Sequence, residues 1–80
     1  MKIEIAGENA LIIYFGDKNN AMISEKVQHA ETLLRQNCHH VIVDLVASYA
    51  SLLVIYDVLK CDYFYIRRQL HNYLDNISIH

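Results

Sequence analysis

The sequence has no proline, no tryptophan and only two glycines among its 80 residues. Because Gly7 and Gly16 are the only glycines, a P-loop and the glycine-rich dinucleotide fingerprint are both excluded. Positive charge is also scarce: the net charge is −2, and Arg67 and Arg68 form the only adjacent basic pair. This charge is too small to hold a phosphate backbone, so we expect no nucleic-acid partner.

A long apolar run and a secretory signal are missing as well. The longest unbroken apolar run, Ala10 to Phe15, is far shorter than the roughly 20 residues that span a bilayer. The N-terminal residues "MKIEIAGEN" contain no apolar core of a signal peptide. We therefore expect a cytoplasmic protein with no membrane partner.

Potential metal ligands are present, but not at the spacing that a metal site requires. Cys38, His39 and His40 are adjacent, yet no CxxC or HxxxH pair supplies further ligands, so we expect no metal site. Cys38 and Cys61 are too few for a disulfide framework. We interpret both cysteines as ordinary small apolar residues.

The serines do not indicate an enzyme either. Ser48 and Ser51 are not part of a GxSxG nucleophile elbow, so we predict no catalytic residue and no cofactor in these 80 residues. The hydrophobic fraction of 54% is nevertheless high for a chain that forms one small domain, residues 1–80. Some apolar surface should therefore remain for a protein partner or a second copy.

The first half of the sequence predicts a β-hairpin and an amphipathic helix. "KIEIA" alternates charged and apolar residues, and "ALIIYF" follows across a turn in which Gly7 and Asn9 tolerate a positive φ. Apolar residues then recur at helical spacing: Ile23, Val27, Ala30 and Leu34. Asn20 is the expected N-cap of this helix, and Asn37 is its expected stop.

The second half predicts two more strands and a final helix. "VIVDLVASYASLLVIYD", Val41 to Asp57, reads as strand throughout, but at about 3.3 Å per residue it would reach on the order of 55 Å. The chain must therefore fold back, and small residues occur only in "ASYAS", Ala47 to Ser51. Tyr49 should lie at the tip of this connection or folded back over the sheet. Asp62 then caps a helix with apolar residues at Ile66, Leu70 and Leu74, beside Tyr63, Tyr73 and Ile77.

The ββαββα order predicts an α+β fold, a two-layer sandwich. In this fold two helices cover one face of a four-stranded antiparallel sheet, and their apolar residues are buried against it. The opposite face, which carries Ile12 and Tyr14, should be left without cover from this chain. That face or a sheet edge is the expected place for a partner.

Two blocks of the sequence carry a resemblance to a known family. In "GENALIIYFG" the matching residues are Gly7, Ala10, Phe15 and Gly16, and in "VASYASLLVIYD" they are Val46, Tyr49, Ser51, Leu52, Leu53, Val54, Tyr56 and Asp57. On these residues the chain resembles the N-terminal domain of the family that contains the B-type subunit of 5-oxoprolinase, the KipI-type sensor histidine kinase inhibitors and proteins called allophanate hydrolase subunit 1. The resemblance implies a ββαββα two-layer fold, in agreement with the periodicity.

The chain also departs from the family pattern. A proline of the family falls at Ala47, an arginine at Ala50 and a second proline at Val58. The larger cyclophilin-like domain of the family is not found in these 80 residues, and the resemblance implies that catalysis depends on that domain and on a companion subunit.

We therefore interpret the chain as a protein-interaction or assembly module that is not catalytic by itself. The resemblance implies a companion subunit or a sensor histidine kinase as its partner, and a homo-oligomer is a further possibility. The alternative function is a part of an ATP-dependent 5-oxoprolinase or allophanate hydrolase complex whose catalytic domain lies elsewhere.

Overall fold

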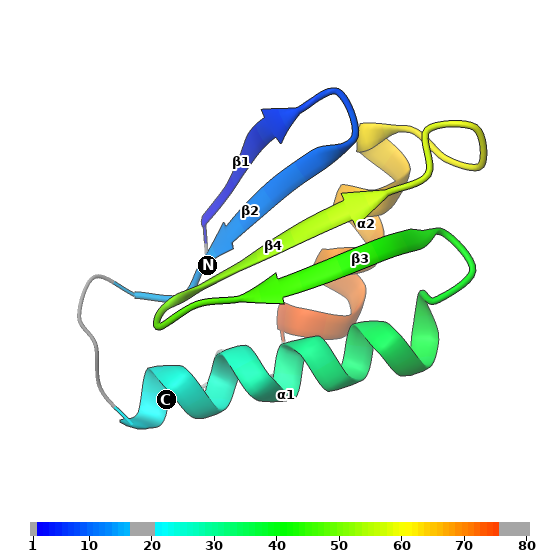
Figure 1. Ribbon diagram of the computed structural model, residues 1–80. Helices are drawn as coiled ribbons and strands as arrows, with labels where there is room; N and C mark the ends of the chain where they lie inside the picture. The colour runs from blue at the N-terminus through cyan, green and yellow to red at the C-terminus, as the bar shows by residue number, and fades with distance from the viewer. Residues whose placement is uncertain (1, 17–20, 76–80) are drawn as a thin grey trace.

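Strands and helices alternate along the chain in the predicted order ββαββα. The computed structural model describes residues 2–16 and 21–75. The elements are β1 (Lys2–Gly7), β2 (Ala10–Tyr14), α1 (Ala21–Asn37), β3 (Ile42–Ala47), β4 (Ser51–Tyr56) and α2 (Tyr63–Leu74). The strands form one antiparallel sheet in the order β1-β2-β4-β3, and both helices lie on the same side of it (Figure 1). The predicted α+β two-layer sandwich is confirmed.

The position of each strand in the sheet follows from its composition. β2 and β4, "ALIIY" and "SLLVIY", contain no charged residue and occupy the centre. The two edge strands carry charges, Lys2 and Glu4 on β1 and Asp44 on β3. A charged side chain keeps its contact with water more easily on an edge strand than at the centre of the sheet, where burial without a partner is costly.

The core lies between the helices and the sheet. Each helix buries three residues, Val27, Ala30 and Leu34 from α1 and Ile66, Leu70 and Leu74 from α2. They pack with the helix-facing residues of the sheet and of the connection before β3: Leu11, Ile13, Cys38, Val41, Leu45, Leu52, Val54 and Tyr56. Tyr63 and Tyr73 are partly buried beside this core, as predicted.

The last turn of α1 agrees with the prediction, whereas the first turn differs from it at Ile23. Ile23 was expected in the core, but its side chain is only half-buried, because it lies at the first turn of α1. α1 ends at Asn37 as predicted, and the Asn37 side chain donates to the Leu33 carbonyl oxygen at 2.9 Å. The predicted N-cap Asn20 and the apolar position Ile77 lie outside the described residues.

The predicted hairpin of β1 and β2 is present. Gly7 and Asn9 of its turn tolerate a positive φ, but no residue in ranges 2–16 and 21–75 has one. The pairing of β1 with β2 shifts between Ile5 and Gly7. Such an irregularity adds local twist to the strand, so the hairpin closes without a left-handed residue.

The β3–β4 connection and the start of α2 agree with the predictions made from the sequence. β3 and β4 are joined by residues 48–50, where the Ser48 N–H donates to the Ser51 carbonyl oxygen at 2.9 Å. Tyr49 lies at the tip of this connection and is 70% exposed. Asp62 caps α2, since its carboxylate accepts a bond from the Tyr65 N–H at 2.8 Å.

Neither helix in the described part of the chain has the length and apolar character needed to cross a bilayer.

Candidate functional site

The two sequence motifs meet in the middle of the sheet. β2 carries the first motif and β4 carries most of the second, and the register sets Tyr14 opposite Ser51 and Ala10 opposite Ile55. Just beyond the strands, the Phe15 N–H donates to the Ala50 carbonyl oxygen at 2.8 Å. Residues about forty positions apart are thus held together by one antiparallel ladder.

Tyr56 and Leu52 are structural members of the second motif. Both side chains are buried in the core, at 3% and 0% exposure. The Tyr56 N–H donates to the Asn9 carbonyl oxygen at 2.9 Å, and its hydroxyl donates to the Glu8 carbonyl oxygen at 3.4 Å. Burial raises the pKa of the Tyr56 hydroxyl, with smaller effects of Cys61, Asp62 and Tyr63. Tyr56 therefore fixes the β1–β2 turn from the neighbouring strand.

Asp57 organises the connection from β4 to α2. Its carboxylate accepts a bond from the Leu59 N–H at 2.9 Å, and its carbonyl oxygen accepts from Lys60 and Cys61. Its own N–H donates to the Val41 carbonyl oxygen at 2.9 Å, which continues the β3–β4 ladder by one step. The role of this carboxylate is to hold a turn, as short acidic side chains commonly do.

The two motif glycines differ in how much space a larger side chain would have. At Gly7 an added Cβ would meet only the Ala10 side chain at 3.9 Å, an ordinary contact. At Gly16 an added Cβ would collide with the Cδ1 methyl group of Ile23. Phe15 is partly buried against the core. The end of the first motif is therefore a point where the chain passes close over α1.

Among the motif residues with a hydroxyl group, Tyr49 and Ser51 are accessible, whereas Tyr56 is buried. Tyr49 projects from the β3–β4 connection, whereas Ser51 is half-buried at the start of β4. Ser51 shares its face of the sheet with Tyr14, which is 37% exposed. Of the remaining motif residues, Ala10, Val46 and Leu53 lie on this same face of the sheet, and most of the others line the core or form turns.

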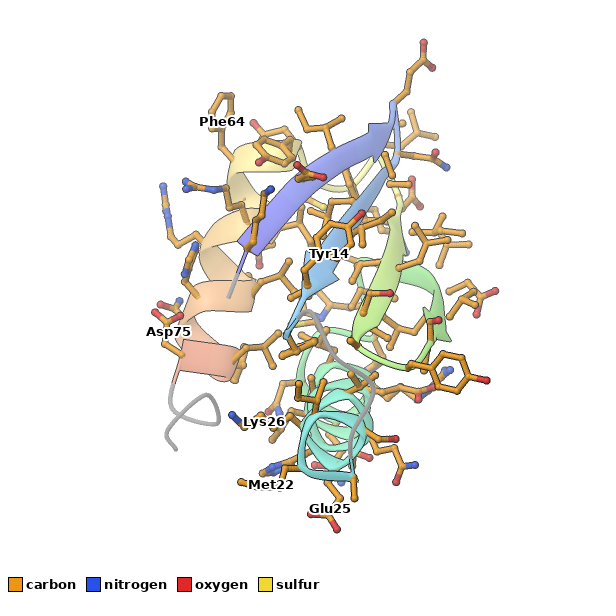
Figure 2. The ribbon with its side chains drawn as sticks, turned by 90° about the vertical axis from the view of Figure 1, so that its left-hand side faces the viewer. Tyr14, Met22, Glu25, Lys26, Phe64 and Asp75 are labelled. Carbon is orange, nitrogen blue, oxygen red and sulfur yellow. The ribbon has the colours of Figure 1, made fainter. Side chains whose placement is uncertain are left out.

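The face of the sheet that no helix covers carries a continuous apolar strip, which we call the helix-free face. Alternation along the strands and the register between them place its apolar members on three adjacent strands: Ala10, Ile12, Tyr14, Val46, Leu53 and Ile55. Ile12 and Leu53 are paired partners at its centre, and Val46 beside Leu53 is 49% exposed. In Figure 2 the sheet is seen from its side, with α2 on the opposite side from this face.

Charged residues border the helix-free face on both edge strands. Lys2 and Glu4 of β1 pair with each other at 3.3 Å, and Asp44 of β3 lies beside Ile55. An apolar centre with a charged border is the usual composition of a protein-binding surface.

A second group of exposed apolar side chains lies away from this face. Val58 and Leu59 project from the β4–α2 connection at 54% and 93% exposure, and Phe64 projects from the first turn of α2 (Figure 2). A shallow hollow beside α1 is lined by Met22, Glu25, Lys26 and His29, all from one helix, among the described residues. The side chains of Met22, Glu25 and Lys26, which are labelled in Figure 2, do not converge on a common point.

The cysteines and histidines do not form a metal centre in the described part of the chain, where no three His, Cys, Asp or Glu side chains could hold an ion. His39 and His40 are exposed and contact each other edge to face, with ring centroids 6.0 Å apart. Burial raises the pKa of the Cys38 thiol, and Cys61 adds to this shift. Burial also raises the pKa of Cys61, and the carboxylates of Asp62 and Asp57 add to this shift. Both thiols are therefore weak nucleophiles.

Several residues of the helix-free face were not predicted from the sequence. Only Ile12 and Tyr14 were singled out, whereas Leu53, Ile55 and Val46 lie beside them. The alternation of β4 contains this information, but the strand order is also needed, because only the pairing of β2 with β4 joins the two apolar rows.

Comparison with known proteins agrees with the fold and places the chain in a family. Residues 1–79 match the family model "Carboxyltransferase domain, subdomain C and D". Among solved structures, the conserved uncharacterized protein PH0987 from Pyrococcus horikoshii superposes with a TM-score of 0.82 and 35% sequence identity. The match covers 96% of this chain and 34% of that protein, so the chain spans about a third of its length. Among curated proteins the chain has no match. The chain belongs to the family of the carboxyltransferase domain, subdomain C and D.

Proposed function

We propose that the chain is a non-catalytic assembly module, related to the B-type subunit of 5-oxoprolinase and to KipI, and that it binds a protein partner through the helix-free face of its sheet. The observation that carries this proposal is the apolar strip across β2, β4 and β3, centred on Ile12 and Leu53. Both helices pack on the other side of the sheet, so the described residues leave this strip uncovered (Figure 1).

The chemistry of the strip favours a folded protein surface as its partner. Its centre is aliphatic, Tyr14 and Tyr49 supply aromatic rings near one end, and charges lie only at the border. Aromatic residues are enriched, and charges depleted, at the centre of protein interfaces. A phosphate backbone would require a basic surface instead.

The size of the relative supports a partner that is a further domain or subunit. The chain corresponds to only 34% of the Pyrococcus horikoshii protein, so a module of this kind occurs there with about twice as much additional polypeptide. In the family that the motifs resemble, such modules work with a cyclophilin-like domain and a companion subunit. A companion subunit of that type is therefore the first partner to test.

The two narrower functions differ in the partner that they require. A 5-oxoprolinase or allophanate hydrolase role requires a companion subunit, and a KipI-type role requires a sensor histidine kinase. Ala50 occupies the position of a family arginine, next to the exposed Tyr49. An arginine contact from this connection is therefore not available to the present chain, whichever partner binds.

Isothermal titration of the chain with each candidate partner from the same genome tests the proposal. Val46→Arg places a charge on the exposed part of the helix-free face and should weaken binding about tenfold or more. Gln36→Arg adds the same charge on α1, away from this face, and is the matched control. Binding to one candidate that Val46→Arg weakens and Gln36→Arg leaves unchanged supports the proposal. The proposal is contradicted if both variants bind with the same affinity, or if the chain binds neither candidate partner.

A further inference from the structure

The edge of the sheet at β3 is closed by side chains at Leu45. Hydrogen bonds alternate along antiparallel strands, so every second residue of an edge strand turns its N–H and C=O away from the sheet. On β3 one such residue is Leu45. Its N–H bonds the Asp44 carboxylate at 2.8 Å, and its carbonyl oxygen accepts a bond from Arg35 of α1 at 3.5 Å. Glu31 in turn holds Arg35 at 2.8 Å. Another strand cannot add here without displacing these contacts.

The opposite edge, at β1, is open. The Phe15 N–H donates to the Ala50 carbonyl oxygen. Because the direction of the backbone groups alternates along a strand, the N–H and C=O groups of the odd-numbered residues of β2 point toward β4, and those of the even-numbered residues point toward β1. The register of β1 with β2 then turns the backbone groups of Ile3 and Ile5 outward. Within residues 2–16 and 21–75 no side chain is seen bonding to them, and Figure 1 shows no helix or loop beyond β1. The Ile5 side chain is 67% exposed.

The charges on β1 are arranged in a self-complementary way. Lys2 and Glu4 are two residues apart, so they lie on the same face of the strand, where they pair at 3.3 Å. Their side chains are 72% and 50% exposed. Between them lies Ile3, which is one of the two residues with outward backbone groups.

We propose that β1 pairs with β1 of a second copy of this chain, antiparallel and with Ile3 opposite Ile3, so that the two sheets join into one. A two-fold axis through this pair sets Lys2 of each copy opposite Glu4 of the other. The two outward-facing Ile3 residues then exchange both of their backbone hydrogen bonds. This inference goes beyond the proposed function, because it concerns an edge and a second copy, and either can hold without the other.

Two competing registers are less favourable. Centring the pair on Glu4 places two glutamates directly opposite each other, and like charges at opposed positions destabilise a strand pair. Centring it on Ile5 runs the ladder into the irregularity between Ile5 and Gly7, where the strand is twisted and the pairing is interrupted. Opposite charges across the strands thus favour the register centred on Ile3.

Charge exchange on β1 tests the dimer. Sedimentation velocity of the whole chain, measured from micromolar to millimolar concentration, should show a monomer–dimer equilibrium. Lys2→Glu sets two pairs of glutamates opposite each other, and Glu4→Lys sets two pairs of lysines opposite each other, so each should weaken dimerisation about tenfold or more. The double variant Lys2→Glu/Glu4→Lys restores opposite charges and should dimerise like the wild type.

These variants distinguish an effect of the pairing register from an effect of net charge and from association through the helix-free face. Lys2→Glu and Glu4→Lys change the net charge in opposite directions, so a general charge effect would move their dimerisation in opposite directions. Amide exchange at Ile3 should also slow with rising concentration, whereas exchange at Leu45 should not. A strict monomer at millimolar concentration overturns the inference. So does self-association that Val46→Arg abolishes and both single β1 variants leave unchanged, because the copies would then meet through the helix-free face.

Discussion

The hydroxyl of Tyr56 at the end of β4 reaches the carbonyl oxygen of Glu8 in the β1–β2 turn, 3.4 Å away. This bond joins residues 48 positions apart in the sequence, and the buried ring beneath it packs in the core. The ring and the hydroxyl therefore make separable contributions to stability.

Tyr56→Phe removes the hydroxyl and keeps the ring. A net hydrogen bond contributes about 0.5–1.5 kcal/mol, and the long distance of this one places the expected loss in unfolding free energy at the lower end. Tyr56→Ala also removes the ring and should cost about 3–5 kcal/mol. Urea denaturation of both variants measures the two effects. A loss for Tyr56→Phe as large as that for Tyr56→Ala would be inconsistent with a packing role of the ring.

Leu34 and Leu70 test the assignment of the helical faces. Both side chains are fully buried between the helices and the sheet, so Leu34→Ala and Leu70→Ala should each lower the unfolding free energy by about 2–5 kcal/mol. Leu59→Ala is the control, because its side chain is 93% exposed and its change should stay within about 0.5 kcal/mol. A loss below about 1 kcal/mol at both buried positions would mean that the faces are misassigned.

The capping of α2 makes a third stability prediction. The Asp62 carboxylate accepts a bond from the Tyr65 N–H at 2.8 Å, so Asp62→Ala should cost about 0.5–2 kcal/mol. Asp62→Asn keeps an oxygen that can accept this bond, and its stability should remain close to that of the wild type. Thermal unfolding followed by circular dichroism compares the three proteins. Equal losses for Ala and Asn would point to the charge of Asp62, and not to its hydrogen bond, as the source of its effect.

The elements were predictable because their signals are local. Helical spacing gave the buried faces of α1 and α2, the small residues around Tyr49 gave the turn between β3 and β4, and Asp62 gave the start of α2. The closure of the first hairpin was not predictable in the same way. It depends on an irregular pairing between Ile5 and Gly7, which no single residue type marks.

The candidate site was less accessible from the sequence than the fold. The apolar strip arises only when Ile12 of β2 is paired with Leu53 of β4, forty-one positions later, and this pairing is a property of the strand order. The difference between the two edges depends on Arg35 of a helix reaching the carbonyl oxygen of Leu45. Such long-range contacts have no local pattern.

The two cysteines give the pH dependence of stability a definite sign. Burial raises the pKa of the Cys38 thiol, with a smaller effect of Cys61, and burial raises that of Cys61, with smaller effects of Asp62 and Asp57. Folding therefore favours the protonated thiols. This contribution is complete below the ordinary thiol pKa of about 8.5 and is lost as the pH rises through the higher folded-state values.

The unfolding free energy should consequently fall as the pH rises above about 8.5. The double variant Cys38→Ala/Cys61→Ala will be less stable overall, but its stability should fall less steeply over the same range. Urea denaturation from neutral to alkaline pH, under reducing conditions, gives both slopes. Equal slopes in the two proteins would show that the thiols do not contribute to the pH dependence.

The isolated chain should not turn over 5-oxoproline or allophanate, with or without ATP. Its hydroxyl-bearing accessible motif residues do not form a reactive group: Tyr49 projects into solvent, and among residues 2–16 and 21–75 no histidine or carboxylate bonds the Ser51 hydroxyl. Both thiols are held in their protonated form by burial, and a protonated thiol is a poor nucleophile.

Product formation by the purified chain can be followed for each substrate, with the boiled protein as the blank. Ser48→Ala and Ser51→Ala distinguish true turnover from a contaminating hydrolase. Activity that one of these substitutions abolishes, while the variant stays folded, would make the chain an enzyme and would contradict the role of a non-catalytic module.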